Sequence, residues 1–276
     1  MKILICTDGS PAAEEAANLV ARMGFPLDAQ ITLLGVSESD GDKANLYDSM
    51  DRIVTALGGS RQGLVRTLRH GQPVEEILHE LQSQAYDLVA VGERGHHHGL
   101  PLLKLGSTAG KLARRINTHL LVARNVPNSI NKILVCTGAE NPSVDTMQRS
   151  GRLIAGSNAE VGLLHVMSQV FLGPRSHPED ILDSAESAII RGTREGTHLK
   201  LAIEQLEKTG VKGSIKPFIR HGLVVDKVLA EINKENYDLL VLGAHHQPGQ
   251  NRWLEILLDD VADQLLNQAV CSVLVV

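Results

Sequence analysis

The sequence predicts an α/β protein with two tandem doubly wound domains, each a five-stranded parallel sheet with helices on both faces. Two observations carry this prediction. Four blocks of the first half recur in the same order in the second half, which indicates two copies of one domain. Within a copy, continuous apolar runs alternate with helix-like segments, and this alternation is typical of a parallel sheet covered on both faces.

The repeated blocks define the two copies. KILICTDGS from Lys2 matches KILVCTGAE from Lys132, RHGQPVEEIL from Arg69 matches RHGLVVDKVL from Arg220, AYDLVAVG from Ala85 matches NYDLLVLG from Asn236, and the final runs are HLLVA and SVLVV. A period of about half the chain is too long for a solenoid. The turn-forming letters NVPNS lie near Arg124–Ile130, so we expect domains at residues 1–126 and 127–276.

The elements of the first copy follow from its apolar runs. The expected strands are Lys2–Thr7, Gln30–Val36, Leu64–His70, Asp87–Val91 and His119–Ala123. The expected helices are Pro11–Arg22, Lys43–Leu57, Pro73–Ser83 and Ser107–Ile116. Doubly wound sheets bind ligands beyond the carboxyl ends of their strands, where the strand order reverses. The exits of the first and fourth strands, at residues 7–10 and 92–95, are therefore the expected mouth of a site.

The segment VGERGHHHGLPLLKLGSTAGK, residues 91–111, has the features of a phosphate cradle. Gly92 and Gly95 follow a strand, where glycine lets the backbone turn sharply and leaves no Cβ to block a ligand. Gly106-Ser107-Thr108 opens a helix and offers free N–H groups, two hydroxyls and the positive end of the helix dipole.

Composition excludes several classes of protein. With 276 residues, 43% of them hydrophobic and 21% charged, the chain is globular. Its formal charge of −5 argues against a sequence-independent nucleic-acid binder, and no apolar run approaches the roughly 18 residues of a membrane span. The start MKILICTDGS indicates a strand and not a signal peptide. Cys6, Cys136 and Cys271 stand in or beside apolar runs, as buried thiols in a reducing cytoplasm would, so we expect a cytoplasmic protein.

These motifs together resemble the universal stress protein family. The first strand ends in Asp-Gly-Ser, and the third strand carries xxHGxPxxxI. A YDLVxVG strand and a loop of the type Gly-x2-Gly-x9-Gly-Ser/Thr follow, although here ten residues separate Gly95 from Gly106. The resemblance covers both halves and implies the strand order 3-2-1-4-5 in each. It also implies that the halves pair through their sheet edges as an intrachain pseudo-dimer, and it leaves a homodimer of two chains open.

The resemblance also implies a nucleotide site. ATP-binding members use residues that correspond here to Thr7, Asp8, Val36, Val91, Gly92, Gly95, Gly106, Ser107 and Thr108. The expected ligand is ATP, or AMP or ADP, and Mg²⁺ is the metal that would accompany ATP. Asp8 would accept hydrogen bonds from ribose hydroxyls or the adenine amino group. Backbone groups near Val36 and Val91 would read the adenine edge. Taken alone, Asp8-Gly9-Ser10 would be a turn with a helix N-cap.

The second half departs from this pattern. Asp8 becomes Gly138, the glycine loop becomes Gly243-Ala244-His245-His246, and Gly106-Ser107 becomes Asp259-Asp260. Two carboxylates suit a helix N-terminus but would repel a phosphate by roughly a few kcal/mol. We therefore expect nucleotide binding by the first domain only. A solvated helix start is favoured over a metal site at the paired Asp residues.

Several other features have competing interpretations. His96–His98 and His245–His246 lie on corresponding loops, where zinc or copper binding competes with a favoured exposed loop. His70 and His221 occupy the same place in both copies, which favours a structural role. The longer stretch at residues 178–209 has an apolar helical face at Leu199, Ile203 and Leu206, and so predicts a helix that caps the second domain. A lid or partner-docking surface is the alternative. We expect Trp253 to be a packing residue.

The predicted function is that of a stress-response protein that binds an adenine nucleotide. No Walker lysine, activating carboxylate pair or arginine clamp is present, so no catalytic residue is assigned and any ATP hydrolysis would be slow and incidental. The alternative is a nucleotide-independent scaffold whose second domain binds a protein or an apolar ligand. A ligase or adenylating enzyme is disfavoured because the signatures HIGH and SGGxDS do not occur.

Overall fold

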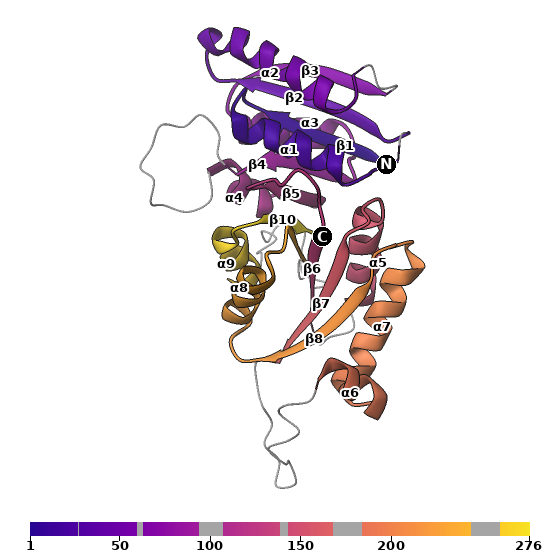
Figure 1. Ribbon diagram of the computed structural model, residues 1–276. Coiled ribbons are helices and arrows are strands. Elements are labelled where there is room, and N and C mark those ends of the chain that lie inside the picture. Colours follow the sequence, from indigo (N-terminus) through magenta and orange to yellow (C-terminus); the bar gives the residue numbers. More distant parts are fainter. Residues whose placement is uncertain (27, 60–62, 94–106, 139–142, 168–183, 244–259) are drawn as a thin grey trace.

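The computed structural model describes all of the chain except residues 27, 60–62, 94–106, 139–142, 168–183 and 244–259 (Figure 1). Its strands form one sheet with the order β3-β2-β1-β4-β5-β10-β9-β6-β7-β8. The strands are β1 Lys2–Thr7, β2 Gln30–Ser37, β3 Leu64–His70, β4 Leu88–Gly92, β5 His119–Ala123, β6 Lys132–Thr137, β7 Glu160–Met167, β8 Ile215–His221, β9 Leu239–Leu242 and β10 Ser272–Val275. Each half is parallel and has the order 3-2-1-4-5 in its own strands, so the predicted fold class is confirmed.

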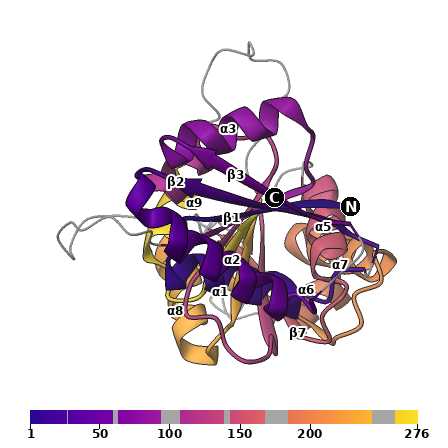
Figure 2. The ribbon, with the colours of Figure 1, turned by 90° about the horizontal axis from the view of Figure 1, so that it is seen from above.

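Helices cover both faces of this sheet. They are α1 Pro11–Arg22, η1 Asp40–Asp42 (a short 3₁₀ turn), α2 Lys43–Ala56, α3 Pro73–Ser83, α4 Ser107–Ala113, α5 Ser143–Ile154, α6 Ala185–Arg191, α7 Arg194–Lys208, α8 Val224–Glu235 and α9 Asp260–Gln268. Side chains alternate along each strand, so Ile3 and Ile5 pack under α1 and α2, whereas Leu4 and Cys6 pack under α3 and α4. Figure 2 shows α3 on one side of the first-half strands and α1 and α2 on the other.

The two halves join through their edge strands. β5 pairs antiparallel with β10, with Leu121 opposite Leu274, so the expected pairing of sheet edges within one chain is present (Figure 1). The backbones also touch at the ends of α1 and α5, where a Cβ on Gly156 would lie 2.0 Å from the Gly24 oxygen. No side chain fits between the halves at this point.

The extra length of the second half forms two helices. Leu199 and Leu206 of α7 are fully buried in the core and Ile203 packs against it, so the predicted amphipathic helix is confirmed. Thr193 caps α7 by accepting from the Gly196 N–H at 3.1 Å. α7 covers the sheet where α2 does in the first half, and α6 packs on α7. None of the helices described here is long and apolar enough to cross a membrane.

Candidate functional site

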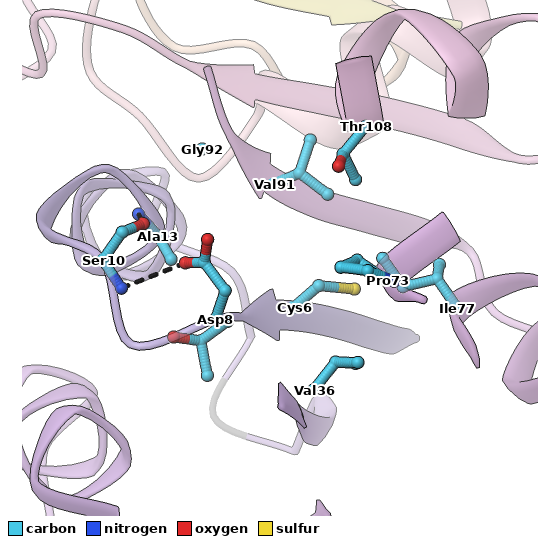
Figure 3. A pocket seen from close by; sticks show the side chains of 11 residues that line it. Cys6, Asp8, Ser10, Ala13, Val36, Pro73, Ile77, Val91, Gly92 and Thr108 are labelled. Atoms are coloured by element: carbon cyan, nitrogen blue, oxygen red, sulfur yellow. Dashed lines mark hydrogen bonds between the residues drawn. The ribbon is translucent and has the colours of Figure 1, made fainter. Parts of the chain in front are cut away.

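A pocket opens at the carboxyl edge of the first-half sheet, between α1, α3 and α4 (Figure 3). It is lined by Cys6, Thr7, Asp8, Ser10, Ala13, Val36, Pro73, Ile77, Val91, Gly92 and Thr108. β1 and β4 are neighbours in the sheet, and β2 and β5 lie on their outer sides, so the pocket stands at the point where the strand order reverses. The predicted mouth is therefore the place where the structure has a cavity.

The exit of β1 is built as a turn that caps α1. The Thr7 hydroxyl accepts from the Gly9 N–H at 3.0 Å, and one Asp8 oxygen accepts from the Ser10 N–H at 3.0 Å. Ser10 then caps α1, because its hydroxyl oxygen accepts from the Ala13 N–H at 3.3 Å. The turn interpretation of Asp8-Gly9-Ser10 is thus confirmed. The same turn presents the Asp8 carboxylate to the pocket (Figure 3).

The remaining wall of the pocket is mostly apolar. Val36 at the end of β2 and Val91 at the end of β4 are each 3% exposed. Pro73 and Ile77 come from the first turns of α3, and Cys6 comes from β1. Ser10 belongs to the predicted mouth, whereas Pro73, Ile77 and Ala13 line the pocket without having been predicted from the sequence. A signal for two of them was present, since the i, i+4 pair Pro73 and Ile77 starts the helix that follows the His-Gly-x-Pro signature.

Gly92 is required by packing against α1. A Cβ at Gly92 would lie 2.4 Å from the backbone carbon and oxygen of Ala12. The corresponding Gly243 faces the Thr146 side chain, with a Cβ distance of 2.8 Å. Because both copies keep this glycine against the helix that follows their first strand, packing accounts for it before any ligand is considered.

The structure brings six of the predicted site residues to this pocket: Thr7, Asp8, Val36, Val91, Gly92 and Thr108. Gly95 and Gly106 lie outside the described residues. Ser107 is the first residue of α4, and its side chain lies outside the described part as well. Thr108 contributes the described hydroxyl of the predicted cradle.

The corresponding edge of the second half carries different groups. Gly138 replaces Asp8 and is exposed, and Val261 stands in the place of Thr108, so a carboxylate and a hydroxyl are both missing from the described part of this edge. Asp259 and His245–His246 lie outside the described residues, as do His96–His98 and Trp253.

A histidine pair lies between β7 and α7 in the second half. His165 on β7 takes the place of Gly35 on β2, since both stand opposite the last residue of the first strand of their copy. Its ring centroid is 5.3 Å from that of His198 on α7. Thr137 joins them, because its hydroxyl lies 2.8 Å from His198 Nε2 and its carbonyl oxygen lies 3.1 Å from His165 Nδ1. Burial lowers the pKa of His198, and nearby His165 and Arg194 lower it further.

This pair predicts that the protein loses stability as the pH falls through the range of a free histidine. The folded state holds His198 at a lowered pKa, so the unfolded chain binds more protons below about pH 6.5. The free energy of unfolding should therefore be larger at pH 7.5 than at pH 5.5. Urea unfolding at both pH values measures this difference. His198→Gln should reduce the difference, and an unchanged pH dependence in that variant would rule out the histidine as its source.

The surroundings of Cys6 and His70 indicate structural roles for both side chains. Burial raises the pKa of the Cys6 thiol, and the Glu80 carboxylate raises it further, so Cys6 stays protonated at neutral pH and serves as a packing residue. His70 lies 3.4 Å from the Ser37 hydroxyl through its Nδ1, which ties β3 to the end of β2. In the described part of the chain, no group of three or more His, Cys, Asp or Glu side chains is placed to hold a metal ion.

Comparisons with known proteins agree with this architecture. The chain matches the universal stress protein family model twice, over residues 1–124 and 129–276. A universal stress protein structure from Archaeoglobus fulgidus is similar with a TM-score of 0.65 at 16% identity, with 99% of this chain and 97% of that chain covered. A Pseudomonas aeruginosa structure assigned to the same family reaches 0.66 at 16% identity, with 100% and 92% covered. At these identities the likeness concerns the fold alone. None of the curated proteins compared with the chain matches it.

Proposed function

The chain belongs to the universal stress protein family, and from this premise we propose that its first half binds an adenine nucleotide, ATP, ADP or AMP, in the pocket between α1, α3 and α4. One observation carries the proposal. Asp8 lies in the turn after β1, Val36 and Val91 belong to β2 and β4, and Thr108 belongs to α4. All four line one cavity at the carboxyl edge of the sheet.

Each group suits one part of a nucleotide. Val36 and Val91 lie on either side of Cys6 (Figure 3), and their apolar side chains would contact a flat base. Asp8 accepts from the Ser10 N–H and lines the pocket, where its carboxylate would accept hydrogen bonds from ribose hydroxyls or the adenine amino group. Thr108 lies in the first turn of α4, the helix that follows the glycine-rich segment, and its hydroxyl would donate to a phosphate oxygen.

The proposal assigns the site to the first half only. In the second half, Gly138 has no carboxylate and Val261 has no hydroxyl, so the described groups that would hold ribose and phosphate are both lost. The sequence pair Asp259-Asp260 adds negative charge where a phosphate would sit. We therefore infer one nucleotide per chain.

Mg²⁺ would bind here through the nucleotide. Asp8 is the one carboxylate among the described lining residues, and one of its oxygens already accepts a backbone hydrogen bond. Mg²⁺ prefers several oxygen ligands and commonly takes them from phosphates and water. Phosphate oxygens would thus be its main ligands, and the chain's own groups would bind and orient the nucleotide.

The first experiment is the identification of nucleotide carried by the protein. Freshly purified chain is denatured, and the released small molecules are identified by mass spectrometry. We expect an adenine nucleotide, or sub-millimolar ATP binding by calorimetry where none is retained. Absence of both would contradict the proposal and favour a scaffold that acts without nucleotide.

Asp8→Asn should weaken ATP binding about 10-fold or more, because a hydrogen bond to a charged group contributes about 1.5–3 kcal/mol. The variant keeps an oxygen for the Ser10 N–H, so the turn that leads into α1 is preserved. Asp48→Asn on the exposed face of α2 makes the same charge change away from the pocket and is the control. Calorimetric titration of both variants checks the prediction, and equal affinities would refute the role of Asp8.

A further inference from the structure

Arg124 is a buried cation at the seam between the halves. It follows β5, and its side chain is 6% exposed. Its guanidinium donates to the Leu266 oxygen at 3.1 Å and to the Ala269 oxygen. Leu266 lies in the last turn of α9 and Ala269 directly follows the helix, where helix carbonyls lack partners and a cation is favourable. A side chain of the first half therefore caps a helix of the second.

Glu93 is the acidic partner of this cation. Arg124 Nε lies 3.1 Å from a Glu93 carboxylate oxygen. The contact is one of charge, because Nε does not reach hydrogen-bond geometry with any partner in the described part of the chain. An uncompensated buried charge is strongly destabilising, so the Glu93 carboxylate offsets the burial of Arg124.

Glu93 stands next to the nucleotide pocket. It follows Gly92 directly, and its N–H donates to the Ala123 oxygen at 3.0 Å. Val91 and Gly92, which line the pocket, pair in the sheet with Val122 and Ala123, just before Arg124. The side chains of Glu93 and Arg124 thus connect the wall of the pocket with the end of α9.

The backbone at this seam is held independently of the Arg124 side chain. The Arg124 N–H donates to the Ser272 hydroxyl at 3.1 Å, and this hydroxyl donates to the Arg124 oxygen at 3.0 Å. The Asn125 side chain donates to the Val270 oxygen at 2.8 Å. Changes to the Glu93 or Arg124 side chains should therefore leave the pairing of β5 with β10 in place.

We propose that Arg124 is a positioning residue which, through Glu93, couples the nucleotide pocket of the first half to α9 of the second half; this rests on the proposed function. A nucleotide that holds Val91 and Gly92 also holds Glu93, and Glu93 holds the guanidinium on the α9 carbonyls. Coupling of this kind is reciprocal, so the α9 contact also strengthens nucleotide binding. The second half lacks the acidic partner, since the residue corresponding to Glu93 is Ala244.

Amide hydrogen exchange of the full chain, with and without ATP, tests this coupling. In the unaltered protein, ATP should slow exchange in peptides that cover residues 260–272. Glu93→Gln removes the charge that holds the guanidinium, so it should remove that slowing and weaken ATP binding about fivefold or more. Arg124→Lys keeps the charge but loses the two-pronged cap, and it should also remove the response.

Glu160→Gln is the matched control. Glu160 pairs with Lys216 at 2.8 Å in the second half, far from the pocket in the sheet order, so its loss should change neither the ATP response nor the affinity. An equal ATP response of α9 in the unaltered protein and in both Glu93→Gln and Arg124→Lys would overturn the proposal. So would ATP binding without any response at α9. Failure of the unaltered protein to bind ATP would instead overturn the proposed function itself, and the first titration identifies that case.

Discussion

The double substitution Gly106→Asp with Ser107→Asp should lower the affinity of the first half for ATP by at least about 100-fold. It copies the sequence of the second half, where Asp259-Asp260 stand at these positions. Two carboxylates beside the phosphates cost roughly 3 kcal/mol or more in a partly desolvated cleft, and about 1.4 kcal/mol corresponds to each factor of ten. Calorimetric titration with ATP measures the loss.

Lys111→Asp is the control for this prediction. It makes the same change of two charge units and lies on the exposed side of α4, in its last turn. We expect this variant to keep most of its affinity, because a solvent-exposed charge is screened by salt. Thermal unfolding of both variants checks that the fold is intact. If the two variants lost affinity equally, net charge and not the cradle would control binding.

Gly92→Ala should destabilise the protein by about 3 kcal/mol or more, whereas Gly243→Ala should cost about 1 kcal/mol or less. The added Cβ at Gly92 meets the backbone carbon and oxygen of Ala12 at 2.4 Å, and a helix backbone has no rotamer to move. At Gly243 the contact is with Cγ2 of Thr146 at 2.8 Å, which a small side-chain shift relieves. The same substitution therefore has two different costs in two corresponding places.

Urea unfolding of both variants without nucleotide measures this difference. The two changes are matched in chemistry and in position along the repeat, so they differ only in what the new methyl group meets. A loss of unfolding free energy in Gly92→Ala as small as the one expected for Gly243→Ala would contradict the packing explanation for Gly92. That result would favour the role that the sequence suggests for this glycine, which is access for a ligand.

Much of the fold could be predicted because its signals are local. β1, β3, β5, α1 and α3 have the predicted bounds, since apolar runs and turn residues mark both of their ends. The internal repeat predicts the same fold for the second half. It also separates fold from site: Arg69 pairs with Glu80 at 2.6 Å in the first copy, and Arg220 pairs with Glu231 at 2.8 Å in the second. A contact kept in both copies does not require a ligand.

The site could be predicted only in part, because its walls come from distant segments. Asp8 and Thr108 carry polar groups at strand and helix ends and so stand out in the sequence. Pro73 and Ile77 have the same character as core residues, and it is the packing of α3 over the carboxyl edge that places them at the pocket. Arg124 has no local signal, since its partners Leu266 and Ala269 lie more than 140 positions away in the sequence. A buried arginine is recognised only when the two halves are joined.

The stoichiometry of ATP binding to the full chain tests the central claim most directly. Native mass spectrometry at increasing ATP concentration counts the bound molecules, and the same measurement on Asp8→Asn assigns them to the first half. We predict one nucleotide per chain at saturation, with weaker occupancy in the variant. Two equivalent nucleotides per chain, or none at millimolar ATP, would contradict the account.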